Sequence, residues 1–403
     1  LVEGCGEFLA RRTRKRLPSE PVEARIESLS DDGRGVAHVA GKAVFVHGGL
    51  PGERVMLRYS GRRRQHDEGV VLEVLEPSPD RVAPRCPHFG VCGGCTLQHL
   101  RPQAQIQAKQ QVLLDALSCI GGVEAAEILP PLVALPWGYR RKARLGVKYV
   151  PKKGKVLVGF RERGSSFVTD LTRCETLHPK VGEAVEALGA LVASLSVRDR
   201  IPQIEVSMGD GPCVLIFRLL QAPSGQDLAR LDAFGKQQGF SIWVQESGAQ
   251  SLHPLPGHGV DLCYGLPQFA LRLHFQPTDF TQVNAELNRL MVAQALALLD
   301  PQPGDQILDL FCGLGNFTLP LAQRAAQVVG VEGEGGLVAR GRDNAERNGL
   351  HNLRFYTSDL YQPLDNEPWL HERFDKALLD PPRSGALQVL DHLPRVGVRR
   401  ILY

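Results

Sequence analysis

The sequence has no long hydrophobic run and few cysteines. No stretch of eighteen apolar residues occurs in its 403 residues, so we expect no membrane-spanning helix. The first twenty residues are charged and lack the apolar segment of a secretory signal. Nine cysteines are too few for a disulfide scaffold of this size. We therefore expect a cytoplasmic protein with reduced thiols, in which clustered cysteines bind metal or take part in chemistry.

The overall composition is that of an ordinary globular protein. Hydrophobic residues make up 43% and charged residues 23% of the chain, which excludes disordered and collagen-like classes. The length predicts two or three domains. We see no internal repeat and no low-complexity segment.

Positive charge is concentrated in one part of the chain, although the net charge is only +3. Eleven basic and two acidic residues lie between Trp137 and Arg173, and Trp137, Tyr139, Tyr149 and Phe160 are interleaved with them. Cations between aromatic rings favour a polyanion whose bases can stack. A solvated, strand-rich face is the alternative interpretation of this stretch.

Composition and periodicity divide the chain into five parts. Short alternating strands separated by Gly and Pro turns predict a small β-barrel of the kind that presents a face to oligonucleotides. Strands and helices that alternate after Pro277 predict a parallel sheet with covering helices. The expected parts are a basic tail (1–20), the barrel (21–77), a mainly β central domain with one helix near 180–194 (78–100 and 130–275), a helix that packs on the last domain (101–129), and an α/β domain (276–403).

The last domain carries the pattern of a nucleoside-cofactor site. A glycine turn that includes Gly313 and Gly315 follows an apolar strand and opens a helix. Glu332 ends the next strand, where it can accept hydrogen bonds from ribose hydroxyls, and Asp359 ends the third, within reach of an adenine amino group. The third glycine of a dinucleotide fingerprint is replaced by Thr318, so S-adenosylmethionine fits better than a nicotinamide dinucleotide.

The fourth strand of this domain ends in Asp380-Pro381-Pro382-Arg383. The two prolines predict a rigid turn that holds Asp380 over the reactive end of the cofactor. Enzymes that methylate exocyclic amines carry an aromatic residue where this chain has Arg383, which argues against amine methylation. A proline-rich loop without a functional role is the alternative.

Three cysteines lie within ten residues, at Cys86, Cys92 and Cys95, with two glycines between the last two. Such spacing lets a chain wrap a metal centre. Three close cysteines with a distant fourth, for which Cys174 is the best candidate, suit an iron–sulfur cluster. Zinc, with His88 or His99 as the fourth ligand, is the alternative.

These motifs together resemble the RNA (uracil-5-)-methyltransferases, and most closely the type that modifies 23S ribosomal RNA. The resemblance covers nearly the whole chain. It implies a multi-domain fold: a small all-β, OB-like TRAM barrel, a mainly β central iron–sulfur domain, and a Rossmann-like class I methyltransferase domain. It also implies that Cys86, Cys92, Cys95 and Cys174 bind a [4Fe-4S] cluster. The S-adenosylmethionine contacts that it implies are Gln282 of the Thr281-Gln282-Val283-Asn284 motif, Phe311, Asn316, Glu332, Asp359 and Asp380.

The resemblance also implies residues that this sequence does not contain. The family's nucleophilic cysteine lies in a Ser-Cys-Asn-Pro turn after the strand that begins here at Ile401, and its glutamate base lies further on. We therefore expect no catalytic nucleophile within 1–403, an α/β domain that is incomplete at its C-terminus, a protein that continues past Tyr403, and an inactive fragment.

The expected activity is methylation of carbon 5 of a single-stranded or flipped uridine in 23S ribosomal RNA by a monomer, through a cysteine adduct at carbon 6. Three alternatives remain: an RNA-binding iron–sulfur module whose methyltransferase-like domain is not catalytic, uracil methylation of another RNA such as tRNA, and cytosine-5 methylation. The last is expected to show a Pro-Cys turn where this chain has Pro381-Pro382.

Overall fold

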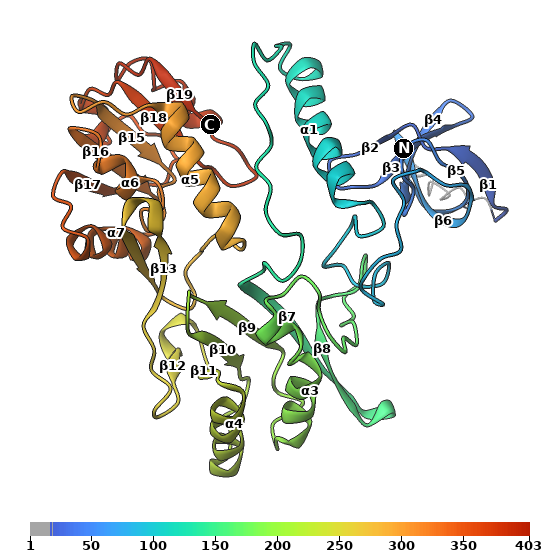
Figure 1. The fold of residues 1–403 in the computed structure, drawn as a ribbon. Coiled ribbons are helices and arrows are strands. Elements are labelled where there is room, and N and C mark those ends of the chain that lie inside the picture. The colour runs from blue at the N-terminus through green and yellow to red at the C-terminus, as the bar shows by residue number, and fades with distance from the viewer. Residues whose placement is uncertain (1–16, 18) are drawn as a thin grey trace, which may run out of the picture. The chain divides into compact units, whose positions relative to one another are not determined.

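The computed structural model describes residue 17 and residues 19–403, which fall into two compact units. Unit 1 is Leu1–Pro131 and unit 2 is Leu132–Tyr403 (Figure 1). Almost all of the predicted basic tail (1–20) lies outside the described residues. No helix within the described part of the chain is both long and apolar enough to cross a membrane. Residues 78–131 cluster with the barrel, whereas the division that joins 78–100 to the central domain stays a prediction.

Unit 1 is built on a six-stranded sheet in the order β1-β5-β6-β4-β3-β2. Its strands are β1 (Val22–Arg25), β2 (Ser28–Leu29), β3 (Gly35–Val39), β4 (Lys42–His47), β5 (Arg54–Arg62) and β6 (His66–Glu76). The predicted alternation holds, because Ala24, Val44 and Val55 are buried in one core while their neighbours in sequence are more exposed. The turn at Asp32-Gly33 leads into β3, a strand that the sequence analysis did not identify.

The rest of unit 1 is a loop of turns and one helix. The loop carries Cys86, Cys92 and Cys95 and is closed by an isolated bridge between Arg81 and Leu100. Helix α1 (Pro102–Cys119) begins with a proline, whose fixed φ suits the first turn of a helix. This confirms the predicted helix, although Ala104 is its only buried residue. The packing of this helix on the last domain stays a prediction.

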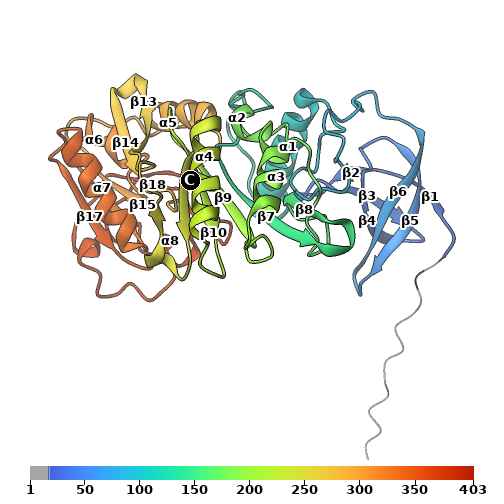
Figure 2. The same cartoon turned by 90° about the horizontal axis from the view of Figure 1, so that it is seen from below.

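The first part of unit 2 is a six-stranded sheet in the order β12-β11-β10-β9-β7-β8. Helices α3 and α4 contact each other and pack on β8 and β11, so they cover the same face of the sheet (Figures 1 and 2). The elements are β7 (Lys142–Val150), β8 (Lys155–Gly159), α2 (Pro179–Gly182), α3 (Val185–Ser194), β9 (Gln203–Met208), β10 (Cys213–Arg218), α4 (Gly225–Gln238), β11 (Ser241–Gln245) and β12 (His253–Pro254).

Helix α4 corrects the expectation of a single helix in this region. Its start is encoded by a capping box in which Ser224 and Asp227 each accept a hydrogen bond from the other's backbone N–H. Gly239, with a φ of 69°, ends the helix in the left-handed conformation. Both signals are present in the sequence.

The second part of unit 2 is the predicted parallel sheet. A hairpin and a long helix lead into five strands in the order β17-β16-β15-β18-β19, and every neighbouring pair is parallel. The elements are β13 (Leu262–Leu266), β14 (Leu271–Phe275), α5 (Ala285–Leu299), β15 (Gln306–Leu310), α6 (Thr318–Ala322), β16 (Gln327–Glu332), α7 (Gly335–Arg347), β17 (Leu353–Thr357), β18 (Lys376–Leu379), α8 (Leu387–Leu390) and β19 (Arg400–Leu402).

The two faces of this sheet are covered differently. Residues of α5, α6, α7 and the β13–β14 hairpin share one hydrophobic core with Ile307 and Val328. Leu308 and Val329, the next residues along the strands, face a second core built largely from loop segments around Trp369. The strand order reverses at β15, which places a crevice at the carboxyl ends of β15 and its neighbours.

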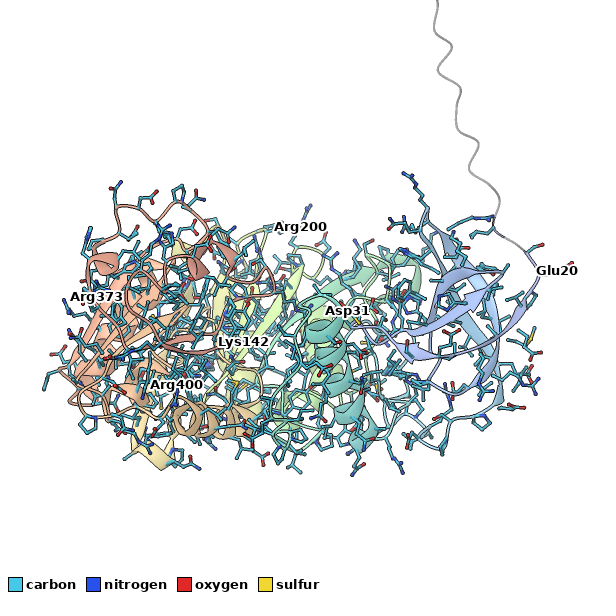
Figure 3. All side chains as sticks on the ribbon, turned by 90° about the horizontal axis from the view of Figure 1, so that it is seen from above. Glu20, Asp31, Lys142, Arg200, Arg373 and Arg400 are labelled. Atoms are coloured by element: carbon cyan, nitrogen blue, oxygen red, sulfur yellow. The ribbon has the colours of Figure 1, made fainter. Side chains whose placement is uncertain are left out.

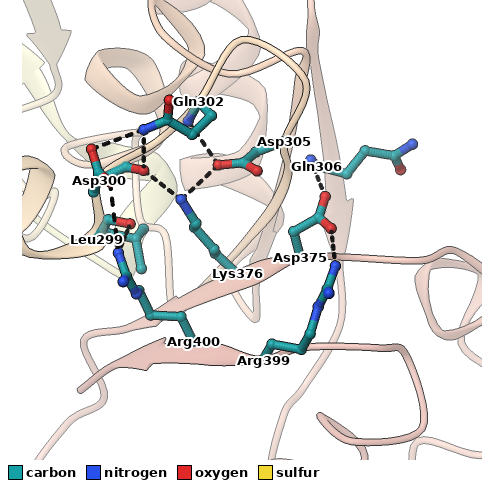
Figure 4. A network of polar contacts seen from close by, with 9 residues as sticks. All are labelled: Leu299, Asp300, Gln302, Asp305, Gln306, Asp375, Lys376, Arg399 and Arg400. Atoms are coloured by element: carbon teal, nitrogen blue, oxygen red, sulfur yellow. Dashed lines mark hydrogen bonds and ion pairs between the residues drawn. The ribbon is translucent and has the colours of Figure 1, made fainter.

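Ion pairs fasten the opposite, amino-terminal edge of the sheet. Lys376 Nζ lies 2.8 Å from Asp305 Oδ2 and also donates to the backbone oxygen of Asp300, at the end of α5 (Figure 4). Asp375 accepts from Gln306 N at 3.0 Å and from Arg399 at 3.2 Å. These bonds connect the starts of β15, β18 and β19 to α5 and leave the carboxyl edge open.

Candidate functional site

A cavity of about 580 Å³ lies at the carboxyl ends of the parallel strands of unit 2. Six of the eight predicted cofactor residues line it: Gln282, Phe311, Gly313, Glu332, Asp359 and Asp380. They come from the segment before α5 and from the ends of β15, β16, β17 and β18. The structure thus brings together residues that span about a hundred positions of the sequence.

The Glu332 carboxylate is oriented by the backbone and keeps free acceptor capacity. Its Oε2 accepts from Gly313 N at 3.1 Å and its Oε1 from Glu334 N at 3.0 Å. A carboxylate has about four acceptor positions, so two remain for a ligand. The same bond fixes the glycine turn against the end of β16.

Asp359 and Asp380 form the other acidic positions of the cavity wall. Asp359 Oδ1 accepts from Tyr361 N at 3.0 Å, which holds the carboxylate at the end of β17. Asp380 Oδ2 accepts from Gln282 Nε2 at 3.5 Å. The surrounding protein removes water from Asp380 and so raises the pKa of its carboxyl.

A fourth acidic side chain, Asp309, lies beneath the cavity and is fully buried. Thr318 Oγ1 donates to its Oδ2 at 2.5 Å, while no hydrogen bond reaches its Oδ1. Burial, and then the charges of Asp380 and Glu332, raise the pKa of Asp309 to about 7, against the Thr318 hydrogen bond that lowers it. Burial thus favours the protonated form of this carboxyl relative to that of an exposed aspartate.

Phe311 has an unusual backbone conformation for a residue with a side chain, with a φ of 62°. Its ring centroid lies 5.9 Å from that of Tyr361. A non-glycine residue held in the left-handed region is strained, and such strain is concentrated at ligand sites.

The other two predicted cofactor residues, Gly315 and Asn316, are not among the residues that line the cavity. Gly315 has a φ of 100°, a backbone conformation that residues with a Cβ rarely adopt, so the turn calls for glycine at this position. Asn316 exchanges two amide hydrogen bonds of 2.9 Å with Asn288 and accepts a third from Tyr264. A direct cofactor contact by Gly315 or Asn316 stays a prediction.

Four side chains of the cavity wall were not predicted from the sequence: Phe280, Leu337, Leu360 and Tyr361. Phe280 is 67% exposed, which is uncommon for a phenylalanine, and it directly precedes the Thr281-Gln282-Val283-Asn284 motif. Its position beside this motif is the sequence feature that could have identified Phe280. No comparable feature in the sequence around Tyr361 indicates a cavity residue.

Buried polar contacts support the segment that carries Phe280 and Gln282. Asp279 is buried and accepts from the backbone N–H of Gln276 at 2.7 Å and from Arg340 of α7. Lys142 of β7, labelled in Figure 3, donates to the backbone oxygens of Pro277 and Asp279. Burial raises the pKa of Asp279 and lowers that of Lys142, in each case partly opposed by opposite charges nearby.

The Cys312 side chain lies inside the glycine turn. Its thiol is buried, and burial together with the charges of Asp309 and Glu332 raises its pKa well above the ordinary value. Because the thiolate is the nucleophilic form of cysteine, a raised pKa disfavours a nucleophilic role for this thiol.

The predicted metal ligands lie in different units. Cys86, Cys92 and Cys95 belong to the loop of unit 1, and Cys174 belongs to unit 2, where its N–H donates to Gly182 O at 3.0 Å. Within residues 19–403, no group of three or more Cys, His, Asp or Glu side chains is arranged to hold a metal ion. The iron–sulfur cluster therefore stays a prediction.

Comparison with known proteins decides the family. Residues 268–403 match the family model described as tRNA (Uracil-5-)-methyltransferase, and residues 15–58 match the TRAM domain. The chain is 54% identical over 97% of its length to 23S rRNA (uracil(1939)-C(5))-methyltransferase RlmD of Alkalilimnicola ehrlichii. The chain belongs to the RlmD family of RNA (uracil-C5)-methyltransferases. This confirms the family that the sequence motifs indicated.

Other members of the family match over a similar span. RlmD of Methylococcus capsulatus is 49% identical over 98% of this chain, and the match covers 89% of that protein. The match to the Alkalilimnicola protein covers 88% of its length. The S-adenosyl-L-homocysteine complex of Pyrococcus abyssi tRNA (uracil-54, C5)-methyltransferase has the same fold, with a TM-score of 0.69 at 21% identity over 94% of this chain and 89% of that one.

Proposed function

We propose that this protein methylates carbon 5 of a uridine in 23S ribosomal RNA with S-adenosylmethionine as the methyl donor. The observation that carries this proposal is the cavity in which Glu332, Asp359 and Asp380 meet at three strand ends, in a chain of the RlmD family. Its volume of about 580 Å³ lies within the range of small-molecule sites.

The arrangement of acceptors supports this donor. S-adenosylmethionine supplies an electrophilic methyl group on a sulfonium. The free acceptor positions of Glu332 suit the two ribose hydroxyls, and the second oxygen of Asp359 suits an adenine amino group. Phe311 and Leu337 contribute apolar side chains to the wall of the cavity. Asp380 and Gln282 lie at the remaining side, where they would orient the uracil ring and the reacting end of the donor.

The uridine must leave its stack to reach this cavity, because a paired base is inaccessible. We propose that the exposed ring of Phe280 stacks on the flipped base. Arg383 lies at the tip of the neighbouring turn and places a cation at the same rim.

Methyl transfer to carbon 5 needs covalent activation of the ring. In the proposed mechanism a cysteine thiolate adds to carbon 6, carbon 5 then attacks the methyl group, a base removes the carbon 5 proton, and the thiolate leaves. No cysteine is among the described residues that line the cavity.

We also propose that Cys86, Cys92, Cys95 and Cys174 hold a [4Fe-4S] cluster with a structural role. Two features support it: Cys86 and Cys92 are buried, and the N–H of Gly94 donates to Cys92 Sγ at 3.4 Å, a contact typical of thiolates that bind such clusters. We further propose that the protein works in the cytoplasm as a monomer, which size-exclusion chromatography with light scattering would test.

The proposed activity is tested with the purified protein, labelled S-adenosylmethionine and 23S ribosomal RNA that lacks the modification. Label recovered as 5-methyluridine after nuclease digestion is the expected result. Tight RNA binding without label would favour the non-catalytic alternative, and label in tRNA alone would change the substrate. Label recovered as 5-methylcytidine would contradict the assignment to uracil.

A further inference from the structure

The wall of the cavity in unit 2 carries more negative than positive charge. Three carboxylates line it, those of Glu332, Asp359 and Asp380, and Arg383 is the one cation among the described residues that line it. A wall of this composition favours a ligand of positive charge over a neutral one of the same shape.

The hydrogen bonds that these carboxylates accept do not compensate their charge, because the donors are neutral. The donors are three backbone N–H groups and one side-chain amide, those of Gly313, Glu334, Tyr361 and Gln282. The contact between Gln282 and Asp380 is the longest of them, at 3.5 Å. A cation that enters the cavity therefore meets carboxylates whose described partners are uncharged.

Asp309 adds a fourth carboxyl behind this wall. It lies on β15, opposite Gly330 of β16 and Leu378 of β18, and it is fully buried. Thr318 Oγ1 donates to its Oδ2 at 2.5 Å, while its Oδ1 has no hydrogen-bond partner. Buried carboxylates are normally paired with a cation, and the hydrogen bonds of Asp309 supply none.

The ionisable groups that act on Asp309 are acidic as well. They are Glu332 at the end of β16, Asp380 after β18 and the Cys312 thiol of the glycine turn, whereas Thr318 of α6 is neutral. Burial, and then the charges of Asp380 and Glu332, raise the pKa of Asp309. A positive charge in the cavity would offset this repulsion and favour the ionised carboxylate.

The proposed methyl donor and its product differ in that charge. In S-adenosylmethionine the sulfur is a sulfonium cation. Methyl transfer breaks the bond between sulfur and the methyl carbon, and the electron pair stays on sulfur, so the product is a neutral thioether. The adenine, the ribose and the amino acid part are the same in both molecules. Contacts to these shared parts therefore bind donor and product alike, and only the charge and the methyl group distinguish them.

We propose that Asp309, together with Asp380, makes the cavity select the cationic S-adenosylmethionine over its neutral product S-adenosylhomocysteine. This inference rests on the proposed function, because it takes S-adenosylmethionine as the ligand. Asp309 is buried, so it acts through its charge across the protein interior, where electrostatic interactions are stronger than in water. The loss of the positive charge on methyl transfer weakens the hold on the product and favours its exchange for a new donor.

The test measures binding of both ligands to the full chain at pH 8 by isothermal titration calorimetry. The parent is expected to bind S-adenosylmethionine about tenfold or more tightly than S-adenosylhomocysteine. Asp309→Asn keeps the shape and an acceptor for Thr318 but removes the charge. It is expected to weaken S-adenosylmethionine about fivefold and to leave S-adenosylhomocysteine nearly unchanged. Asp375→Asn, at the amino-terminal edge of the same sheet, is the matched control and should retain the selectivity.

Two further measurements separate charge from shape. Sinefungin, which carries an ammonium group near the position of the sulfonium, should lose affinity in Asp309→Asn as S-adenosylmethionine does. Between pH 6 and 8 the affinity of the parent for S-adenosylmethionine should rise more steeply than that for S-adenosylhomocysteine, because the cation prefers ionised Asp309. If circular dichroism shows that Asp309→Asn is unfolded, Asp380→Asn replaces it.

Equal affinities of the parent for the two ligands would overturn the proposal. Equal weakening of both ligands by Asp309→Asn would also overturn it, because a purely structural role of Asp309 predicts that result. Failure of the proposed function gives a different outcome, in which neither ligand binds to the parent. Loss of the selectivity alone leaves the proposed methylation in place.

Discussion

The Tyr361 hydroxyl donates to Gly385 O at 3.0 Å and lies 2.8 Å from Ser384 Oγ, which joins the segment after β17 to the turn after β18. This turn begins with Asp380-Pro381-Pro382 and is closed by a hydrogen bond from Gly385 N to Pro382 O. Tyr361 therefore fixes two walls of the cavity relative to each other.

Tyr361→Phe should weaken S-adenosylhomocysteine binding about fivefold, because loss of an intramolecular hydrogen bond costs about 1 kcal/mol. Isothermal titration calorimetry measures the change. Tyr356→Phe is the matched control: its hydroxyl donates to Glu372 at 3.1 Å, it precedes Tyr361 by five residues, and it does not line the cavity. Equal affinities for Tyr361→Phe and the parent would show that the contact does not shape the site.

Glu332→Ala should weaken binding of the same ligand by about 1.5–3 kcal/mol, the scale for hydrogen bonds to a charged group. The carboxylate would lose its contacts with the ligand and with the glycine turn at Gly313. Glu334→Ala, two residues further on and outside the cavity wall, should bind as the parent does. An unchanged affinity in Glu332→Ala would show that the ribose does not bind at Glu332.

Asp309 should make the protein less stable as pH rises. Its pKa is raised from 3.8 to about 7, so between these values the folded state binds more protons than the unfolded state, and stability falls across that interval. The loss is at most about 4 kcal/mol. Asp309→Asn keeps an acceptor for Thr318 but cannot ionise. The melting temperature of this variant should therefore depend less on pH between pH 5 and 8 than that of the parent. Differential scanning fluorimetry measures both. The same pH dependence in parent and variant would contradict a buried proton on Asp309.

Arg340→Met should destabilise unit 2 by about 2–4 kcal/mol, because it leaves the Asp279 carboxylate buried without its partner. The double variant Asp279→Asn/Arg340→Met should recover part of this loss. Arg347→Met, an exposed position on the same helix, is the control. Thermal unfolding measures these variants together with Asp279→Asn alone, and an additive double variant would mean that the pair is not coupled.

Cys92→Ser should remove the brown colour and broad visible absorption expected of anaerobically purified protein. Iron and sulfide analysis checks the same variant. Cys119→Ser, at an exposed thiol at the end of α1, should retain both. If the parent protein is colourless and contains zinc, the iron–sulfur assignment is wrong and the zinc alternative holds.

The local part of this fold could be read from the sequence. The alternation of strands and helices after Pro277 predicted a parallel sheet, and the sheet predicted that Glu332, Asp359 and Asp380 would meet at one edge. The capping signals of α4, at Ser224 and Gly239, are also present in the sequence. Motifs of the glycine turn and the Asp-Pro-Pro turn indicated the family.

Long-range partners were decided only by the tertiary structure. Asn316 follows the glycine turn in sequence, yet its side chain is bonded to Asn288, and Tyr361 joins Gly385 across the cavity. A sequence determines such features as periodicity, caps and turns because they depend on neighbouring residues. Which side chains meet across a cavity depends on how strands order themselves in a sheet, and that order results from burying both of its faces at once.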